Sequence, residues 1–250
     1  MKRHLYILLG VIVVFGFSRL PSSADLTTQS SETPMAATAS HSPAKPIFVT
    51  GDEKVWSDFP KKPALGSKED QADLQTILSV QASRTAEQKD EAMKDKHYQI
   101  ILVTDVIDPA FKTKYPNIYG VLEQADNDCY FITTKLKNEN ARLRPYEQYP
   151  TQVQPLFKTG GLSYPSGHAS GVELQARILA TLFHANGQDA LLLKRAKQVG
   201  DSRVVAGVHY PSDVKEGMDL GDLLFAQLEA NPKFTAELAA AAKADKVPTP

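Results

Sequence analysis

The feature that most constrains this chain is a series of segments, between residues 67 and 244, in which apolar residues recur at helical spacing. Two of these segments begin at patterns that resemble capping boxes, Ser67 with Asp70 and Thr85 with Gln88, whose side chains would satisfy free amides of the first helical turn. Further helices are predicted over 121–138, 171–183 and 190–205, from Pro211 onward, and after Asn231–Pro232. The chain is therefore predicted to be all-α and to fold as a compact helical bundle.

Composition divides the chain into one domain and its tails. Residues 25–46 are rich in Ser, Thr, Ala and Pro and predict a flexible N-terminal segment, residues 47–244 one domain, and residues 245–250 a tail. Inside the domain, the β-branched segment 100–108 could form a strand, but its setting favours a helix. No apolar run there approaches the roughly 18 residues of a membrane span, so no stable membrane insertion is expected. The single cysteine, Cys129, cannot form an intramolecular disulfide and is expected to be a small buried residue.

The N-terminus has the three-part layout of a secretory signal peptide. A basic start is followed by an apolar run over residues 5–17 and by a small-residue cleavage pattern at Ser22 and Ala24. The run is short for a membrane span, although an uncleaved N-terminal anchor is the alternative interpretation. We predict that residues 1–24 are a signal peptide and that the protein is exported to the periplasm, or secreted.

The charge balance limits the classes of partner. A net charge of −1 gives the chain no global field that would attract nucleic acid, so no nucleic acid polymer is expected as a partner. Any binding of anions must therefore depend on local groups of residues. A helical domain of this kind could also pair through an apolar face, which leaves a homo-oligomer open.

The first of three notable segments ends in two cations. Lys137 and Arg144 are seven residues apart, about two helical turns, so a helix end could direct both at one point. Pro145 is expected to stop the helix and to fix where Arg144 leaves it. Converging Lys and Arg side chains suit a phosphate group. The alternative is a solvated basic helix end, stabilised by the helix dipole.

The second segment is the turn Pro165-Ser166-Gly167-His168, which leads into a predicted helix. Gly167 would let backbone amides approach a ligand closely, and amides at a helix N-terminus bind anions. Ser166 could add a hydroxyl donor, and His168 could move a proton near neutral pH. The alternative is an ordinary loop with a helix N-cap.

The third segment places His209 four residues before Asp213, at the start of a helix. This spacing would let the carboxylate accept a hydrogen bond from one imidazole nitrogen and leave the other nitrogen neutral and nucleophilic. Arg203 precedes His209 by about one and a half helical turns and could add a third cation. Taken separately, these residues could equally form a surface pair and a solvated helix face.

Together the three segments resemble the signature of the type-2 phosphatidic acid phosphatase superfamily: Lys-x6-Arg-Pro, then Pro-Ser-Gly-His, then Ser-Arg-x5-His-x3-Asp. The fixed residues present are Lys137, Arg144, Pro145, Pro165, Ser166, Gly167, His168, Ser202, Arg203, His209 and Asp213. Within that superfamily the chain most resembles the bacterial class A non-specific acid phosphatases, through Ser163-Tyr164 before the turn and through Arg84-Thr85. It departs from their signature at Leu162, which replaces a glycine, and at Ala169, which replaces a threonine.

The resemblance implies a fold, a mechanism and a role for each residue. The fold would be the helical bundle shared by these phosphatases and the vanadium haloperoxidases. His209 would attack phosphorus, Asp213 would orient His209, and His168 would protonate the leaving oxygen and then activate water. The phosphoryl oxygens would be bound by Lys137, Arg144, Ser166, Gly167 and Arg203. No metal or other cofactor is implied, and an acidic pH optimum is expected because His168 must be charged while His209 is neutral.

The function predicted from the sequence is an exported acid phosphatase of broad specificity for small-molecule phosphate monoesters, inhibited by vanadate or inorganic phosphate. A lipid-phosphate or pyrophosphate phosphatase of the same superfamily is the strongest alternative. A vanadate-dependent haloperoxidase would share the anion site. A hydrolase built on Ser166, His209 and Asp213 would leave the cations unexplained, and a simple anion-binding module would not need both histidines.

Overall fold

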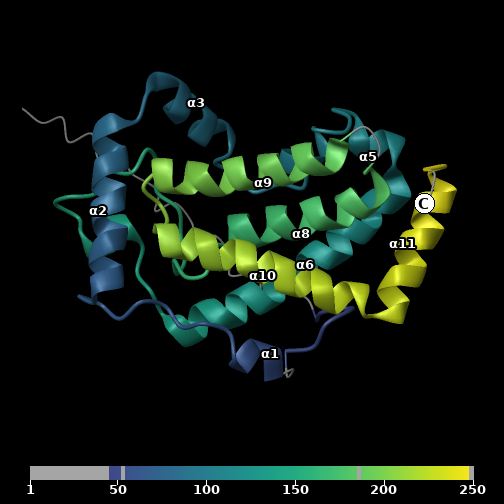
Figure 1. Cartoon of the computed structure of the whole chain (residues 1–250), viewed down its shortest axis with the longest axis horizontal. Helices are drawn as coiled ribbons and strands as arrows, with labels where there is room; N and C mark the ends of the chain where they lie inside the picture. The colour runs from purple at the N-terminus through teal and green to yellow at the C-terminus, as the bar shows by residue number, and fades with distance from the viewer. Residues whose placement is uncertain (1–44, 52–53, 185–186, 248–250) are drawn as a thin grey trace, which may run out of the picture. The chain divides into compact units, whose positions relative to one another are not determined.

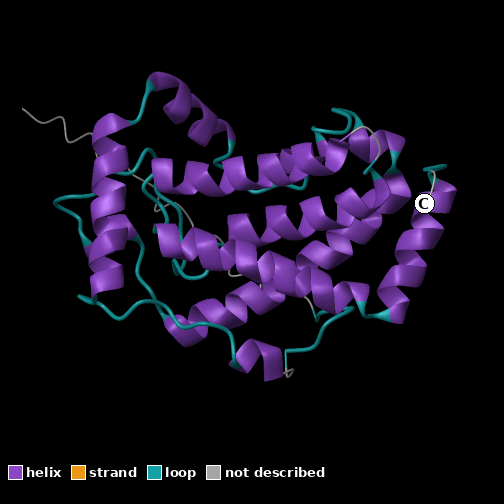
Figure 2. Cartoon of the chain, in the orientation of Figure 1, coloured by secondary structure: helices purple, strands orange, loops and turns teal. Residues whose placement is uncertain are grey.

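The computed structural model describes residues 45–51, 54–184 and 187–247. The predicted signal peptide, residues 1–24, lies outside these ranges, as does all but the end of the predicted flexible segment 25–46. Within the described ranges every regular element is a helix, which confirms the prediction of an all-α fold (Figure 2).

The described residues form eleven helices (Figure 1). In chain order they are α1 (Lys54–Ser57), α2 (Lys68–Ser83), α3 (Ala86–Lys94), α4 (Ile101–Thr104), α5 (Phe111–Lys114), α6 (Pro116–Asn140), α7 (Pro145–Gln148), α8 (Gly167–Leu182), α9 (Gln188–Val205), α10 (Pro211–Glu229) and α11 (Pro232–Ala244). Helices α6, α8, α9 and α10 supply most of the main hydrophobic core.

The predicted helix starts are confirmed where a side chain caps the first turn. The Ser67 hydroxyl accepts a hydrogen bond from the Asp70 amide at 3.2 Å. Thr85 and Gln88 form a reciprocal capping box, with each side chain accepting from the other residue's amide. The Asn231 side chain caps α11 in the same way. Local side-chain chemistry therefore sets these three boundaries.

Other helices begin earlier than the apolar pattern predicted. Helix α6 begins at Pro116 rather than at residue 121, α8 at Gly167 rather than at residue 171, and α9 at Gln188 rather than at residue 190. Each of these helices begins with a proline, glycine or polar residue, which adds nothing to the apolar pattern but suits a helix N-terminus. The ambiguous segment 100–108 is helical only in its short helix α4 and otherwise forms turns.

The prediction that Pro145 stops a helix is wrong. Helix α6 ends at Asn140, because Ala141 adopts a left-handed conformation with φ of 47°. Pro145 instead begins the next helix, α7, where its missing N–H costs nothing. Arg144 therefore lies at the start of a helix, after a short loop, rather than at the end of one.

Helix α8 lies at the centre of the described residues, packed against α6, α9 and α10 (Figure 1). Two glycines of α10 allow a close approach to it. A Cβ on Gly217 would lie 2.6 Å from the Ser166 carbonyl oxygen, and a Cβ on Gly221 would lie 2.6 Å from Glu173 Cβ. These glycines therefore let the N-terminal half of α8 pack closely against the middle of α10.

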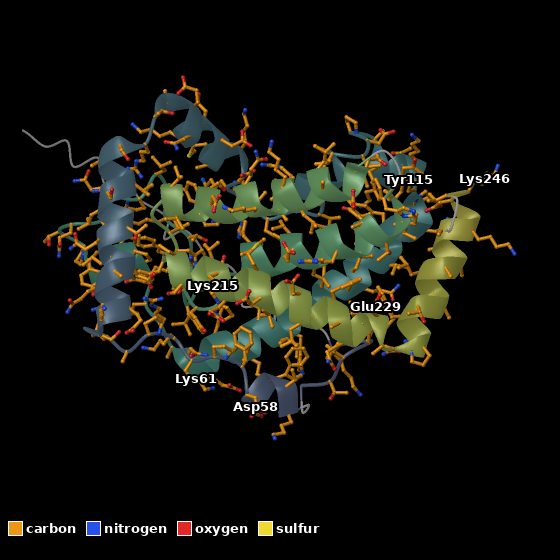
Figure 3. The ribbon with its side chains drawn as sticks, viewed as in Figure 1. Asp58, Lys61, Tyr115, Lys215, Glu229 and Lys246 are labelled. Carbon is orange, nitrogen blue, oxygen red and sulfur yellow. The ribbon has the colours of Figure 1, made fainter. Side chains whose placement is uncertain are left out.

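The interior and the surface follow the expected division. Cys129 is buried, with 2% of its surface exposed, as predicted. The charged pairs on the outside include Lys61 with Glu139 at 3.4 Å and Lys215 with Asp219 at 2.7 Å, and Figure 3 labels the two lysines. Across the described helices, none is long and apolar enough to span a membrane.

Both ends of the domain are fastened to α6 by aspartates. Asp128 accepts hydrogen bonds from the three consecutive amides of residues 47–49, at 2.7 to 3.0 Å. Near the C-terminus, Asp245 accepts from the Ile118 amide at 2.8 Å, and Val247 is buried. The segment predicted to be a tail thus contributes contacts to the domain as far as residue 247.

Candidate active site

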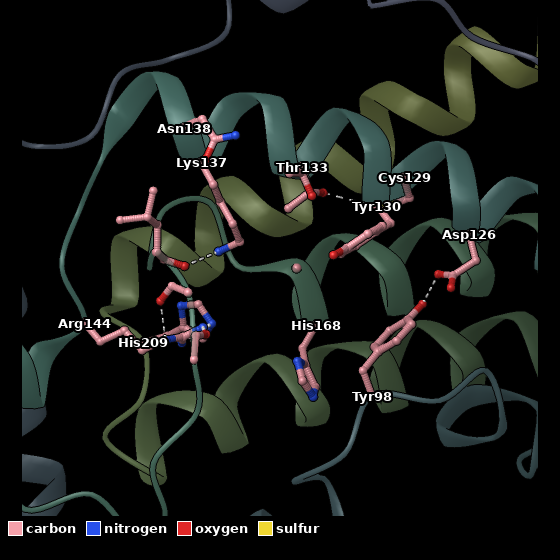
Figure 4. Close-up of a pocket in the computed structure, with 15 residues that line it drawn as sticks. Tyr98, Asp126, Cys129, Tyr130, Thr133, Lys137, Asn138, Arg144, His168 and His209 are labelled. Carbon is pink, nitrogen blue, oxygen red and sulfur yellow. Dashed lines mark hydrogen bonds between the residues drawn. The ribbon is translucent and has the colours of Figure 1, made fainter. Parts of the chain in front are cut away.

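The three sequence segments meet at one cavity. Its volume is about 460 Å³, and it opens between α6, the N-terminus of α8 and the loop that precedes α10 (Figure 4). Five of the eight site residues predicted from the sequence line it: Lys137, Arg144, Gly167, His168 and His209. The remaining three, Ser166, Arg203 and Asp213, are buried and are not among the residues that line it.

His209 is the most enclosed group of the cavity. Its Nε2 lies 3.1 Å from Arg144 Nη1, and its Nδ1 lies 3.3 Å from Asp213 Oδ2 and 3.4 Å from Ser163 Oγ. Because a guanidinium can only donate, Nε2 is the accepting nitrogen and Nδ1 carries the proton. Burial, followed by Arg144 and Lys137, holds the pKa of His209 well below its usual range. The imidazole is therefore neutral, with its lone pair on Nε2.

Asp213 orients this imidazole and is itself held from several sides. It is completely buried, and Oδ2 accepts hydrogen bonds from the Ser163 hydroxyl and from the Tyr210 amide at 2.9 Å. Oδ1 accepts from Arg142 Nη1 at 2.8 Å. A carboxylate with this many donors keeps one position, so the orientation of His209 is fixed through it.

Arg142 connects Asp213 to the distant helix α2. Its Nη2 donates to Asp70 at 3.0 Å and to Asp73 at 2.9 Å, and its guanidinium stacks 3.7 Å above the Tyr210 ring. One cation is thus shared by three buried carboxylates. This pairing makes the charge of Asp213 tolerable in the interior.

Arg144 is held by backbone carbonyls from two loops. Its Nε and Nη2 donate at 2.9 Å to the carbonyls of Gly161 and Gly160, and Nη1 donates at 2.8 Å to that of Val208. Burial lowers the pKa of this arginine, although a guanidinium remains charged. The guanidinium of Arg144 is therefore held in one position beside His209.

Lys137 extends from the last turn of α6 toward the same loop. Its ammonium donates to the carbonyls of Leu162 at 2.6 Å and Ser163 at 3.1 Å. Burial and the nearby Arg144 lower the pKa of Lys137 to about 7. Lys137 is consequently a cation below neutral pH and loses that charge as the solution becomes alkaline.

His168 has fewer hydrogen-bond partners than His209, although the Lys96 backbone forms a hydrogen bond with its ring. Its ring lies edge-to-face with the Tyr98 ring, with centroids 5.4 Å apart and planes at 79°. Its Nε2 is buried and has no hydrogen-bond partner among the described residues. Burial, followed by the charge of Arg203, lowers the pKa of His168 to about 2. The expectation that His168 is protonated is therefore not met in the unliganded site.

Arg203 lies behind this histidine. Its Nη1 donates to the Asp95 carbonyl at 2.9 Å, while its Nε is a second buried nitrogen without a partner in the described part of the chain. Burial and Arg144 lower the pKa of Arg203 to about 9. Two buried nitrogens without hydrogen-bond partners near each other are unusual and mark a place where a ligand would be accommodated.

Ser166 has a structural role in the observed arrangement. Its hydroxyl accepts a hydrogen bond from the Ala169 amide at 3.4 Å and caps α8, and its own amide donates to the Asp213 carbonyl at 2.9 Å. The second contact joins the N-terminus of α8 to that of α10. Gly167 begins α8 and lines the cavity.

Sequence reasoning did not assign functions to several residues of the site. Ser163 holds Asp213, and Arg142 pairs with Asp213 as well as with Asp70 and Asp73. Ser163 was visible only as part of the sequence signature, and the Arg142 contacts join residues about 70 positions apart. No local pattern reports such pairs. In the same described ranges, no group of three or more His, Cys, Asp or Glu side chains is arranged to hold a metal ion.

Comparison with known proteins identifies the family to which the domain belongs. Residues 129–228 match the PAP2 superfamily, and this range contains all three segments of the site. The chain carries a PAP2 superfamily domain. The resemblance inferred from the three segments is thereby confirmed.

Similar proteins include acid phosphatases. The non-specific acid phosphatase of Salmonella typhi is 27% identical over 206 residues, which cover 77% of this chain and 81% of that protein. The non-specific acid phosphatase of Providencia stuartii is 30% identical over 166 residues, which cover 62% of this chain and 66% of that protein.

Two solved structures share the fold. A transmembrane PAP2 type phosphatidylglycerolphosphate phosphatase from Bacillus subtilis aligns with a TM-score of 0.51 at 21% identity, over 66% of this chain and 87% of that one. A bacterial vanadium-dependent iodoperoxidase aligns with a TM-score of 0.58 at 17% identity, over 76% of this chain and 59% of that one. These matches confirm the predicted type of helical bundle.

Proposed function

We propose that this protein is an acid phosphatase that hydrolyses phosphate monoesters through a phosphohistidine formed on His209. The observation that carries the proposal is the neutral His209, with its accepting Nε2 beside Arg144 and Lys137, on the same cavity as a second histidine. The acid phosphatase relatives and the PAP2 domain support the same reaction class.

In the first step, Nε2 of His209 bonds to phosphorus as the bond from phosphorus to the alcohol oxygen breaks. Asp213 stabilises the positive charge that develops on the imidazole through its contact with Nδ1. Lys137, Arg144 and Arg203 offset the negative charge on the phosphoryl oxygens, with the Gly167 amide as a further donor.

The leaving alcohol oxygen takes its proton from His168, and in the second step His168 removes a proton from the attacking water. His168 is neutral in the unliganded site, so the substrate must favour its protonation. A phosphate ester brings negative charge next to His168 and, near its second pKa of about 6, a proton of its own. The charges of Arg203 and His209, which disfavour protonation of His168, are then offset.

An acidic optimum follows from Lys137 as well as from the substrate. With its pKa lowered to about 7, Lys137 is charged in acid and loses its charge above neutrality. The affinity for the phosphoryl group then falls, because one of three cations is lost. We expect activity to decline as the pH rises through this value.

The test is hydrolysis of p-nitrophenyl phosphate from about pH 4 to about pH 8, a range that brackets histidine titration. The assays contain EDTA and are run with and without vanadate, for the wild type and for His209→Ala. Activity that resists EDTA, is inhibited by vanadate and disappears in the variant supports the proposal. Activity that survives the loss of His209, or an alkaline optimum, contradicts it.

The proposal includes export. Residues 1–24 would act as the signal peptide, and the mature chain would begin near Asp25. The N-terminal residue and the mass of the protein recovered from a periplasmic extract test this directly. A chain that keeps its first residues and stays with the membrane would instead indicate an uncleaved anchor.

A further inference from the structure

The cavity has two chemically different ends. Lys137, Arg144 and His209 lie at one end, and His168 lies between them and the opposite end, where Tyr98 and Asp126 are found (Figure 4). Asp126 precedes Lys137 by eleven residues on α6, about 16 Å along the helix axis. The second end is therefore separate from the proposed phosphate position and adjoins the place where the alcohol part of an ester would extend.

Asp126 is the one carboxylate among the described residues that line this cavity. Its Oδ1 accepts hydrogen bonds from the Tyr98 hydroxyl and from Gln175 Nε2, the latter at 3.3 Å. Its Oδ2 has no hydrogen-bond partner in the described part of the chain, and Asp126 belongs to none of the ion pairs found there. Oδ2 of Asp126 is thus free to bind a ligand in the cavity.

Asp126 is half-buried, whereas the fully buried aspartates of the domain have charged or amide partners. Asp95 is paired with Arg195, Asp213 is paired with Arg142, and Asp128 accepts three backbone amides. If Asp126 served only to accept hydrogen bonds from Tyr98 and Gln175, an asparagine at this position would do the same without a charge. Asp126 has no protein cation beside it, although removing a carboxylate from water without a partner cation is costly.

The groups that face Asp126 do not supply the missing cation. They are Tyr98 from the segment before α4, Gln175 from α8, and Glu123 and Cys129 from α6 itself. Burial, which exceeds the effect of the hydrogen bonds from Tyr98 and Gln175, raises the pKa of Asp126 to about 6. A bound cation would lower that pKa again and recover the cost of burying the carboxylate.

Aromatic rings complete this end of the cavity. Tyr98 and Tyr130 both line it together with Asp126. A carboxylate beside aromatic rings is the combination that binds organic ammonium groups, through ionic attraction and through the negative faces of the rings.

We propose that the end of the cavity formed by Tyr98, Asp126 and Tyr130 binds a positively charged ammonium group on the alcohol part of the phosphate ester. The preferred substrates would then be phosphomonoesters of amino alcohols, with the phosphate at the cationic end and the ammonium at Asp126. This inference rests on the proposed phosphatase function, because it concerns the leaving group of that reaction.

The experiment compares matched esters. Values of kcat/KM are measured for aminoethyl, aminobutyl, aminohexyl and aminooctyl phosphate, each against the n-alkyl and the hydroxyalkyl phosphate of the same length. At the length that reaches Asp126, we expect the amine to be preferred by about ten- to a hundredfold, the range of a charged hydrogen bond. The absence of a preference at every length, or an equal preference for the hydroxyl ester, overturns the proposal.

Variants locate the effect. Asp126→Asn should abolish the preference for the amine and leave hydrolysis of the n-alkyl ester unchanged. Glu123→Gln removes the same charge from the outer face of α6, where Glu123 pairs with Lys112 at 3.6 Å, and should leave the preference intact. Tyr98→Phe, which retains the ring, should also keep it. A preference that survives in Asp126→Asn contradicts the proposal.

These outcomes are distinct from failure of the proposed function. Hydrolysis of the n-alkyl phosphates tests the phosphatase activity by itself, while the ratio of amine to alkyl ester tests the ammonium site. If no ester were hydrolysed, binding of the amino and n-alkyl phosphates to the wild type, measured by calorimetry, would still compare the two. Equal affinities would then overturn the ammonium site.

Discussion

His209 and His168 line the same cavity, but the protein holds them in opposite ways. His209 is contacted by Arg144, Asp213 and Ser163, and each of these is fixed by further hydrogen bonds. His168 has a ring contact with Tyr98 and an Nε2 with no partner among the described residues. A nucleophile must meet phosphorus along one line, whereas a proton carrier must serve an alcohol and then a water. The fixed position of His209 suits the nucleophile, and the fewer contacts of His168 suit the proton carrier.

The largest expected difference is in the rate of reaction. His209→Ala should reduce kcat by about 10⁴-fold or more, because no other group can accept the phosphoryl group. His168→Ala should cost only about 10²-fold with p-nitrophenyl phosphate, whose leaving group needs little help from an acid, and more with an alkyl phosphate. Steady-state assays with both esters give this comparison. Equal losses for both esters in His168→Ala would show that His168 is not the general acid.

The second prediction concerns the support behind His209. Arg142→Met should lower the free energy of unfolding by about 3–5 kcal/mol, because it leaves buried carboxylates without their cation. The control is Lys197→Met, which removes a 71% exposed lysine from its pair with the exposed Asp201 and should cost about 1 kcal/mol or less. Urea unfolding measures both. Similar losses would mean that the carboxylate cluster is balanced in another way.

The third prediction uses pH to compare the folded and unfolded states. Burial lowers the pKa of both histidines, so below about pH 6.5 the unfolded chain binds protons that the folded chain does not. Stability should therefore fall as the pH decreases. His168 alone should account for about 2 kcal/mol between about pH 7.5 and about pH 5. Urea unfolding of the wild type and of His168→Asn at both pH values measures this share, and an unchanged pH dependence in the variant would contradict it.

The smallest expected effect comes from the hydroxyl that braces Asp213. Ser163→Ala should reduce kcat by about tenfold, equivalent to one hydrogen bond, because Arg142 and the Tyr210 amide still hold the carboxylate. KM should change little, since Ser163 does not contact the phosphate in the proposed mechanism. A loss as large as that of His209→Ala would mean that Ser163 takes part in the reaction itself.

The same contrast explains what the sequence could predict. Lys137, Arg144, His168 and His209 were found because each belongs to a short pattern, and the structure brings all four to one cavity. The capped helix starts were also predictable, because a cap depends on residues three positions apart. Helices α6 and α9, whose starts have no side-chain cap, were placed too late. The catalytic role of each motif is still a prediction, which the experiments above test.

The groups that a single sequence could not reveal are those that act over long distances. Asp70 and Asp73 lie on α2, and nothing near them indicates that they share Arg142 with Asp213. The lowered pKa of His168 was equally hidden, because it depends on burial and on Arg203 from another helix. Local patterns report residue types, whereas charge balance and burial depend on the assembled fold.

The contacts around Arg142 also bear on the order in which the protein becomes active as it folds. Asp73 on α2 accepts a hydrogen bond from the amide of Ser212, 139 residues later, next to the carboxylate that orients the nucleophile. Closing so long a loop is slow compared with forming helices, so this part of the site belongs to the late stages of folding. During refolding, helical circular dichroism should therefore recover before enzymatic turnover. The time at which product first appears would then report when α2 has made its contact with the start of α10.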